Sequence, residues 1–147
     1  MNERVLIVDD EKEFLEAMEE RISARGMKVA TSMSAEEALA RIEKESFDAI
    51  IMDFQMPGMD GIDALKAIKE KKPELQIILL TGHASVKKGV EAMKEGALDY
   101  IEKPADLDVL TEKIKEAQVN KMIVVDKHNK KVVDDVLMRF GFKNSSQ

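Results

Sequence analysis

Acidic, basic and hydroxyl side chains follow directly after short apolar runs in this chain. The runs end at residues 8, 52, 80 and 101, and the side chains that follow them are Asp9 and Asp10, Asp53, Thr81 and, after Glu102, Lys103. In an open parallel α/β sheet, the carboxyl ends of the strands form the crevice where chemistry is done. We therefore expect these side chains to converge as a cluster of carboxylates with one lysine and one hydroxyl.

The expected cluster has the groups needed to accept a phosphoryl group. This transfer needs in-line positioning and charge neutralisation more than covalent work by the protein. A carboxylate nucleophile is the main covalent requirement, and Asp53, just before the turn Met56-Pro57-Gly58, is the candidate. Asp9, Asp10 and Asp53 would repel one another at close range, so a cation must lie between them, and their hard oxygen atoms suit Mg²⁺. Taken singly, each aspartate would be explained as the cap of a turn or a helix.

The composition excludes several other kinds of site. The chain has no cysteine, which removes disulfides, thiolate catalysis and zinc–thiolate sites. No apolar run exceeds four residues, so we expect neither a transmembrane span nor a signal peptide, and a cytoplasmic location. The net charge of −6 argues against duplex nucleic acid or an anionic membrane as the main partner. We expect no membrane association and no direct contact with nucleic acid.

Short apolar runs alternate with longer amphipathic stretches along most of the chain. The predicted strands are residues 5–8, 27–30, 49–52, 77–80 and 98–101, and a helical pattern follows each of them. Ser34 with Glu37 matches a capping box, and Asp106 is the expected cap of the fifth helix. Five strands alternating with five helices predict an α/β fold with a parallel sheet covered on both faces.

At these residues the chain resembles the receiver domain of two-component response regulators, in which a histidine kinase donates a phosphoryl group to an aspartate. The resemblance covers residues 3–117 and rests on the order Asp9-Asp10, Asp53, Thr81 and Lys103-Pro104, each after an apolar run. It implies a doubly wound five-stranded sheet of strand order 2-1-3-4-5 with five flanking helices. Residues 1–120 would form the receiver domain.

The resemblance also assigns a role to the acidic residues. It implies that Asp53 is the phosphoacceptor and that Mg²⁺ is the cofactor. The metal would be held by Asp10, by Asp53 and by the backbone carbonyl of Gln55. Asp9 would act on it largely through water.

The remaining site residues follow from the same resemblance. Lys103 would pair with the Asp53 carboxylate and then with a phosphoryl oxygen, across a Lys103–Pro104 bond that is usually cis in the family. Thr81 and Tyr100 would form a switch in which the hydroxyl moves toward the phosphate and the ring turns inward. The equal alternative is that Tyr100 is a packing residue with its hydroxyl in water. Gln55 and His83 would lie on the solvent side of the phosphoryl group and tune dephosphorylation.

The expected function is therefore signalling rather than enzymatic turnover. The expected partners are a histidine kinase or phosphotransfer protein and a downstream protein target. The output would be a conformational change of the face formed by helix 4, strand 5 and helix 5. Autodephosphorylation would be a side activity.

Two other classes of function compete with this interpretation. An aspartate-nucleophile phosphohydrolase also places carboxylates, Mg²⁺ and lysine on a doubly wound sheet, but its nucleophile belongs to a D-x-D pair after the first strand. A phosphorylation-independent interaction module would have kept the fold and lost the chemistry. Intact Asp10, Asp53, Thr81 and Lys103 weigh against that module.

Residues 121–147 have a different character, and we predict a helical extension or linker there. An apolar run at 122–125 and a polar stretch at 126–129 precede an apolar stripe that predicts a sixth helix. The stripe consists of Val132, Val133, Val136, Leu137 and Phe140. It would dock on its own receiver, pair with a second chain or lead into another domain, in that order of preference. A homodimer could form through this helix or through the helix 4, strand 5, helix 5 face.

Overall fold

Strand and helix alternate along the chain in the computed structural model, which describes residues 2–139 and 141. The strands are β1 (Arg4–Val8), β2 (Lys28–Ser32), β3 (Ala49–Asp53), β4 (Gln76–Thr81) and β5 (Asp99–Glu102). The helices are α1 (Lys12–Ser23), α2 (Ala35–Lys44), α3 (Gly61–Lys71), α4 (Val86–Lys94) and α5 (Leu107–Arg139). In the described part of the chain, the predicted five strands and five helices are confirmed.

The strands form one parallel sheet of order β2-β1-β3-β4-β5, which confirms the predicted strand order. Asp53, the last residue of β3, lies opposite Leu80 on β4. The next residue of β4, Thr81, lies opposite Glu102 at the end of β5. The register therefore brings the carboxyl ends of these strands to one edge of the sheet, where the predicted site residues stand.

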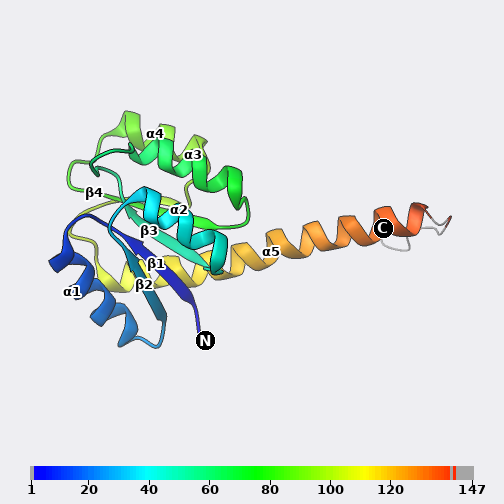
Figure 1. Ribbon diagram of the computed structural model, residues 1–147, viewed down its shortest axis with the longest axis horizontal. Coiled ribbons are helices and arrows are strands. Elements are labelled where there is room, and N and C mark those ends of the chain that lie inside the picture. The colour runs from blue at the N-terminus through cyan, green and yellow to red at the C-terminus, as the bar shows by residue number, and fades with distance from the viewer. Residues whose placement is uncertain (1, 140, 142–147) are drawn as a thin grey trace.

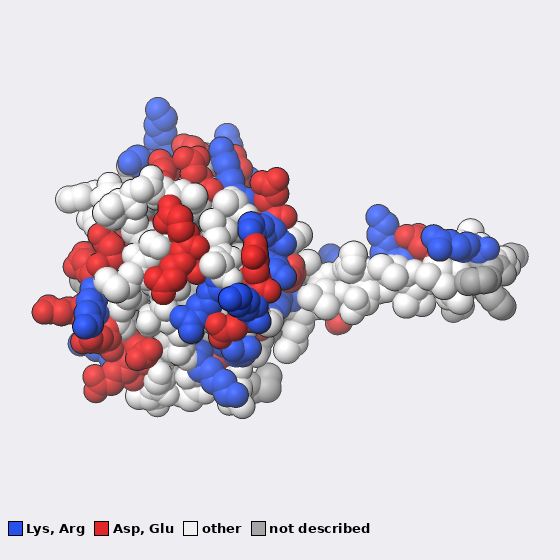
Figure 2. All heavy atoms as spheres, viewed as in Figure 1, with Lys and Arg blue, Asp and Glu red and all other residues white. Residues whose placement is uncertain are grey.

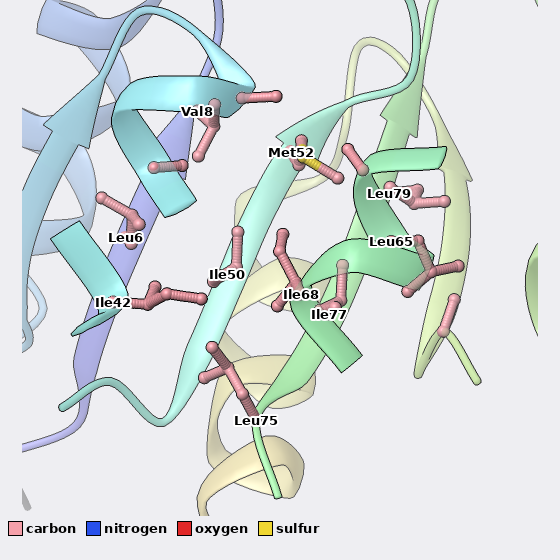
Figure 3. Packing of buried hydrophobic residues seen from close by; sticks show 14 of the residues in the cluster. Leu6, Val8, Ile42, Ile50, Met52, Leu65, Ile68, Leu75, Ile77 and Leu79 are labelled. Atoms are coloured by element: carbon pink, nitrogen blue, oxygen red, sulfur yellow. The ribbon is translucent and has the colours of Figure 1, made fainter. Parts of the chain in front are cut away.

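Helices cover both faces of the sheet (Figure 1). α2, α3 and α4 pack on one face, and α1 and the first part of α5 pack on the other. On the first face, Ile50 and Ile77 of the sheet pack with Ile42 of α2 and with Leu65 and Ile68 of α3 (Figure 3). Each fully buried Leu or Ile side chain stabilises the fold by about 1.5–3 kcal/mol. This packing fixes the positions of the strand ends.

Side-chain caps start four of the helices. Each capping oxygen accepts a hydrogen bond from a backbone N–H two or three residues further on, as is typical of N-caps. The caps are Ser34 for α2, Asp60 for α3, Ser85 for α4 and Asp106 for α5. The predicted caps at Ser34 and Asp106 are confirmed.

The C-terminal part of the described chain differs from the sequence prediction. The predicted sixth helix is not separate, because α5 runs without a break over 33 residues, from Leu107 to Arg139. Residues 118–139 contain neither glycine nor proline, so no residue there interrupts the backbone hydrogen bonds of the helix. The second half of α5 projects away from the body (Figure 1). Neither α5 nor any other described helix combines the length and apolar character of a membrane span.

The preferred arrangement of the apolar stripe, docked on its own receiver, is wrong for the side chains described. Val132, Val133 and Val136 are 46%, 55% and 42% exposed on the projecting helix. Phe140, also assigned to the stripe, lies outside the described residues. The predicted division of the chain at residue 120 falls within α5 and stays a prediction.

Candidate functional site

Three aspartate side chains meet at the carboxyl edge of the sheet. Asp9 and Asp10 follow β1, and Asp53 ends the neighbouring strand β3. One carboxylate oxygen from each of the three lies within 4.8 Å of the other two. Asp9 and Asp53 are buried, whereas Asp10 is exposed. The convergence that the sequence predicts is therefore present, with one side of the cluster open to water.

Asp9 uses both of its carboxylate oxygens within the protein. Oδ1 accepts a hydrogen bond of 2.8 Å from the Glu11 N–H, and Oδ2 accepts one of 3.0 Å from the Lys103 Nζ. Asp9 is only 1% exposed. The exposed Asp10 is thus better placed than Asp9 to give an oxygen directly to an ion, in line with the expectation that Asp9 acts through water.

Lys103 brings a positive charge into the cluster. Its Nζ lies 3.0 Å from Asp9 Oδ2 and 3.7 Å from Asp53 Oδ2, so the nearer carboxylate is Asp9 rather than the expected Asp53. The Nζ also lies 4.3 Å from the centroid of the Phe14 ring, which adds a cation–π contact. The Lys103 N–H donates to the Thr81 carbonyl, and the Lys103–Pro104 bond is cis, as the resemblance implies.

The ionisation of Lys103 depends on its carboxylate partners. Burial alone lowers the pKa of the Lys103 ammonium. The hydrogen bond to Asp9 and the charges of Asp9, Asp53 and Glu11 outweigh burial, so this pKa lies above its ordinary value. Lys103 therefore stays charged in the cluster at neutral pH.

Burial, rather than its charged neighbours, dominates the ionisation of the Asp53 carboxyl. Burial raises the pKa of Asp53, and the charges of Asp9 and Asp10 raise it further. The Gln55 N–H, which donates to Asp53 Oδ1 over 3.3 Å, and the Lys103 ammonium act in the other direction but do not cancel the rise. A further cation beside Asp53 would therefore stabilise its ionised form. Bond formation between its oxygen and an electrophile would remove the charge.

The donor set in this cluster fits Mg²⁺. All the converging ligand atoms are carboxylate oxygens, which are the hard ligands that this ion prefers. Three carboxylates and one ammonium leave a net charge of −2, which a divalent cation would balance. The exposure of Asp10 leaves room for the waters that Mg²⁺ usually retains.

The loop after Asp53 is held close to the end of β3. Gly58 has a φ of 95°, a conformation that side chains with a Cβ rarely adopt. The Gly61 N–H donates to the Phe54 carbonyl, and a Cβ at Gly61 would lie 2.6 Å from that oxygen. Glycine at both positions lets the loop turn back over the strand end, and the turn at Gly58 is the one that the sequence predicts.

Thr81 and His83 adjoin the carboxylates at the end of β4. Thr81 is 1% exposed, and its Oγ1 accepts a hydrogen bond of 3.2 Å from the His83 N–H. The side chains of His83 and Gln55 are exposed. The backbone N–H of His83 thus binds Thr81, and that of Gln55 binds Asp53, while the side chains of both residues face solvent.

Tyr100 of β5 is half-buried, and its ring faces α4. Its ring packs edge-on against Phe54, with centroids 5.6 Å apart, and its hydroxyl accepts a hydrogen bond of 3.4 Å from the Ser85 N–H. A Cβ at Gly89 would lie 3.0 Å from the ring. Because Phe54 directly follows Asp53, the ring contacts the neighbour of the candidate phosphoacceptor on one side and α4 on the other.

Sequence reasoning missed two residues of this site. Phe14 lies on α1, and its contact with Lys103 depends on where α1 places the ring relative to the residues that follow β5. Gly89 was not singled out, although a glycine inside a predicted helix often marks a close approach of another group. That signal would have predicted a close approach at Gly89, although not that Tyr100 is the partner.

Comparison with known proteins agrees with the fold. Residues 5–115 match the family described as the response regulator receiver domain. The transcriptional regulatory protein ZraR of Salmonella typhimurium is 39% identical over 113 residues, which are 77% of this chain and 26% of that protein. A response regulator receiver domain protein from Clostridium thermocellum is 33% identical, with a TM-score of 0.79 over 83% of this chain and 98% of the other. The beryllofluoride-activated NtrC4 receiver domain dimer is 34% identical, with a TM-score of 0.76 over 80% of this chain and 98% of the other.

The chain belongs to the response regulator receiver family of two-component systems. It spans about a quarter of the length of the curated relatives that it matches.

Proposed function

We propose that Asp53 accepts a phosphoryl group from a histidine kinase or phosphotransfer protein in the presence of Mg²⁺. The observation that carries this proposal is the convergence of Asp9, Asp10 and Asp53 with Lys103 at one edge of the sheet. The aspartyl phosphate then shifts the α4–β5–α5 face between two conformations. The chain is a signalling domain in the cytoplasm, and its output reaches a downstream protein target.

The transfer is an in-line displacement at phosphorus. A carboxylate oxygen of Asp53 forms the new P–O bond, while the P–N bond to the donor histidine breaks and the imidazole leaves with the bonding electrons. Asp10, Asp53 and the Gln55 carbonyl would hold Mg²⁺, with Asp9 acting through water. When bound, the ion neutralises charge on the transferring phosphoryl group.

Lys103 and Thr81 act on the product of this transfer. Lys103, held by Asp9, pairs with a phosphoryl oxygen as a point charge. The Thr81 hydroxyl leaves the His83 N–H and donates to another phosphoryl oxygen. Tyr100 then turns inward, which breaks its hydrogen bond to Ser85 and alters the surface of α4 and β5.

Gln55 and His83 set the lifetime of the aspartyl phosphate. The side chains of both residues are exposed. The Gln55 N–H donates to Asp53, and the His83 N–H donates to Thr81. They control the approach of water to phosphorus, which makes dephosphorylation a slow side activity and not enzymatic turnover.

The rival functions receive less support. A phosphohydrolase of the aspartate class carries its nucleophile after the first strand, whereas here the candidate nucleophile ends β3. A binding module without phosphoryl chemistry would not need three carboxylates beside a half-buried lysine. We also propose that this chain forms a homodimer, because the similar beryllofluoride-activated NtrC4 receiver domain is a dimer.

Phosphodonor labelling tests the proposed function. Incubation of the chain with acetyl phosphate and Mg²⁺ is expected to add one phosphoryl group, seen by mass spectrometry of the intact protein. A chelator added beforehand should abolish the label, because the carboxylates then repel the incoming phosphate. Labelling that is equally fast with the chelator would contradict the role given to the metal.

Tyrosine fluorescence tests the proposed switch. The chain has one tyrosine and no tryptophan, so its intrinsic fluorescence reports on Tyr100 alone. Phosphorylation is expected to change this emission, because the ring leaves its contacts with Ser85 and Gly89. Unchanged emission in a fully labelled sample would show that Tyr100 is a packing residue.

A further inference from the structure

Lys103 differs from the basic side chains on the surface of the body in what surrounds it. On the face seen in Figure 2, lysine and arginine side chains lie at the surface among acidic ones. The Lys103 side chain is only 19% exposed, and its ammonium lies 4.3 Å from the centroid of the Phe14 ring as well as beside Asp9 and Asp53. The site lysine is therefore held by an aromatic ring together with two carboxylates.

The start of α1 positions both the ring and the nearer carboxylate. Phe14 lies in the first turn of α1, and its half-buried ring packs against the core on the α1 and α5 face of the sheet. The Asp9 carboxylate accepts a hydrogen bond from the N–H of Glu11, the residue just before the helix. The Lys103 backbone is fixed separately, because its N–H donates to the Thr81 carbonyl. Since the four-carbon stem of lysine is flexible, the contacts of the ammonium with Asp9 and Phe14 decide where the charge lies.

These two contacts hold the ammonium closer to Asp9 than to Asp53. The Lys103 Nζ donates to Asp9 Oδ2 over 3.0 Å, whereas its distance of 3.7 Å to Asp53 Oδ2 is too long for a hydrogen bond. The Phe14 ring face lies against another side of the ammonium and attracts it. Asp53 Oδ2 is therefore not hydrogen-bonded by this lysine and keeps the lone pairs that a nucleophile needs.

We propose that Phe14 is a positioning residue for the phosphoryl transfer, because its ring holds the Lys103 ammonium toward Asp9 and away from the Asp53 oxygen that attacks phosphorus. This role presupposes the proposed function of Asp53. Without the ring, one side of the ammonium loses its contact, and the flexible stem lets the charge move toward the Asp53 carboxylate. A direct hydrogen bond from Lys103 then occupies the attacking oxygen.

The separation between Lys103 and Asp53 matters at the moment of transfer. With acetyl phosphate as the donor, an Asp53 oxygen forms the new P–O bond, while the P–O bond to the acetyl group breaks and acetate leaves with the bonding electrons. A hydrogen bond from Lys103 to the attacking oxygen has to break first, which slows the attack. An ammonium held beside Asp9 leaves this oxygen free and still lies close enough to pair with a phosphoryl oxygen of the product.

A crystal structure of a Phe14→Leu variant of the full chain tests the position of Lys103 without any phosphodonor. Leucine keeps an apolar side chain in the packing but removes the aromatic face. The expected result is a Lys103 Nζ within hydrogen-bond distance of Asp53 Oδ2. An ammonium that kept its wild-type distances to both carboxylates would overturn the proposal. This measurement needs no phosphorylation, so it decides whether the ring positions Lys103 even if the proposed function fails.

The rate of labelling by acetyl phosphate and Mg²⁺ tests the consequence for the reaction. Phe14→Leu is expected to be labelled about tenfold more slowly than the wild type, which is the order of effect of one partly desolvated cation–π contact. Phe14→Tyr keeps the aromatic face and is expected to react within about twofold of the wild-type rate. A wild-type rate in Phe14→Leu, or a Phe14→Tyr variant as slow as Phe14→Leu, would overturn the proposal. A wild type that takes up no phosphoryl group would contradict the proposed function instead.

Phe47→Leu is the matched control for the loss of an aromatic ring. Phe47 is 3% exposed, and its ring centroid lies 5.4 Å from the Arg4 Cζ, just before β3 at the opposite edge of the sheet. This variant is expected to lose at least as much stability as Phe14→Leu in chemical denaturation, yet to be labelled at the wild-type rate. Equally slow labelling of both variants would show that lost packing explains the effect and would overturn the proposal. Phe14→Met, which also lacks a ring, replaces Phe14→Leu in both tests if the leucine variant does not fold.

Discussion

An Asp53→Asn variant is expected to take up no phosphoryl group from acetyl phosphate under conditions that label the wild type completely. An amide is not a nucleophile for this transfer, and the other carboxylates of the cluster are held differently. Asp9 has both oxygens engaged with Glu11 and Lys103, and Asp10 is exposed beside the site. Mass spectrometry of the intact protein measures the loss.

Asp60→Asn is the matched control for this variant. Asp60 lies in the loop that follows Asp53, and its carboxylate caps α3 by accepting from the Ile62 N–H. Asparagine is also a good N-cap, so this variant should fold and be labelled like the wild type. If Asp53→Asn were labelled fully at another aspartate, Asp53 would not be the acceptor.

The same Asp53→Asn variant is expected to unfold at a higher denaturant concentration than the wild type in metal-free buffer at neutral pH. The pKa of Asp53 is raised in the folded state, mainly by burial. A group of this kind adds stability while it is protonated, and that stability is lost as the pH rises through the folded-state pKa. The difference between variant and wild type should therefore shrink as the pH falls toward 4.

Magnesium should reverse this difference. The ion stabilises the folded wild type by mass action, because the unfolded chain has no preformed carboxylate cluster. The variant lacks one of the converging carboxylates and should gain less. Equal stabilisation of both proteins by Mg²⁺ would mean that Asp53 is not a ligand.

Most of the fold could be predicted from the sequence, because β1, β3 and β4 are short apolar runs that a polar residue ends. The caps at Ser34 and Asp106 also follow from local sequence alone. The continuity of α5 was harder to predict. The polar stretch at 126–129 looks like a linker, but no residue in it prevents helix formation.

Contacts between distant elements could not be predicted from patterns. The sequence predicts that Lys103 reaches the carboxylates, but its nearer partner, Asp9, is set by how β1 and β5 lie relative to each other. The packing of the Tyr100 ring against Gly89 likewise depends on the distance between α4 and β5. Both facts require three-dimensional packing.

The preference of Lys103 for Asp9 leads to a second large effect, on stability without metal. A Lys103→Met variant is expected to lose about 2 kcal/mol of its free energy of unfolding in metal-free buffer. Methionine keeps an unbranched stem beside Phe14 but leaves the carboxylates of Asp9 and Asp53 without their cation. Removing one partner of a buried ion pair costs about 3–5 kcal/mol, and the partial exposure of Lys103 reduces that cost.

Lys113→Met provides a control for the loss of a lysine elsewhere on the body. Lys113 pairs with Asp99 over 3.1 Å, but both side chains are about 30% exposed, so the pair is worth less than about 1 kcal/mol. Chemical denaturation of the three proteins, with and without Mg²⁺, measures the effects. The ion should restore most of the stability of Lys103→Met, because a divalent cation among the aspartates neutralises their charge in place of the missing ammonium. If Lys103→Met were as stable as the wild type without metal, Lys103 would not be the cation that holds this cluster together.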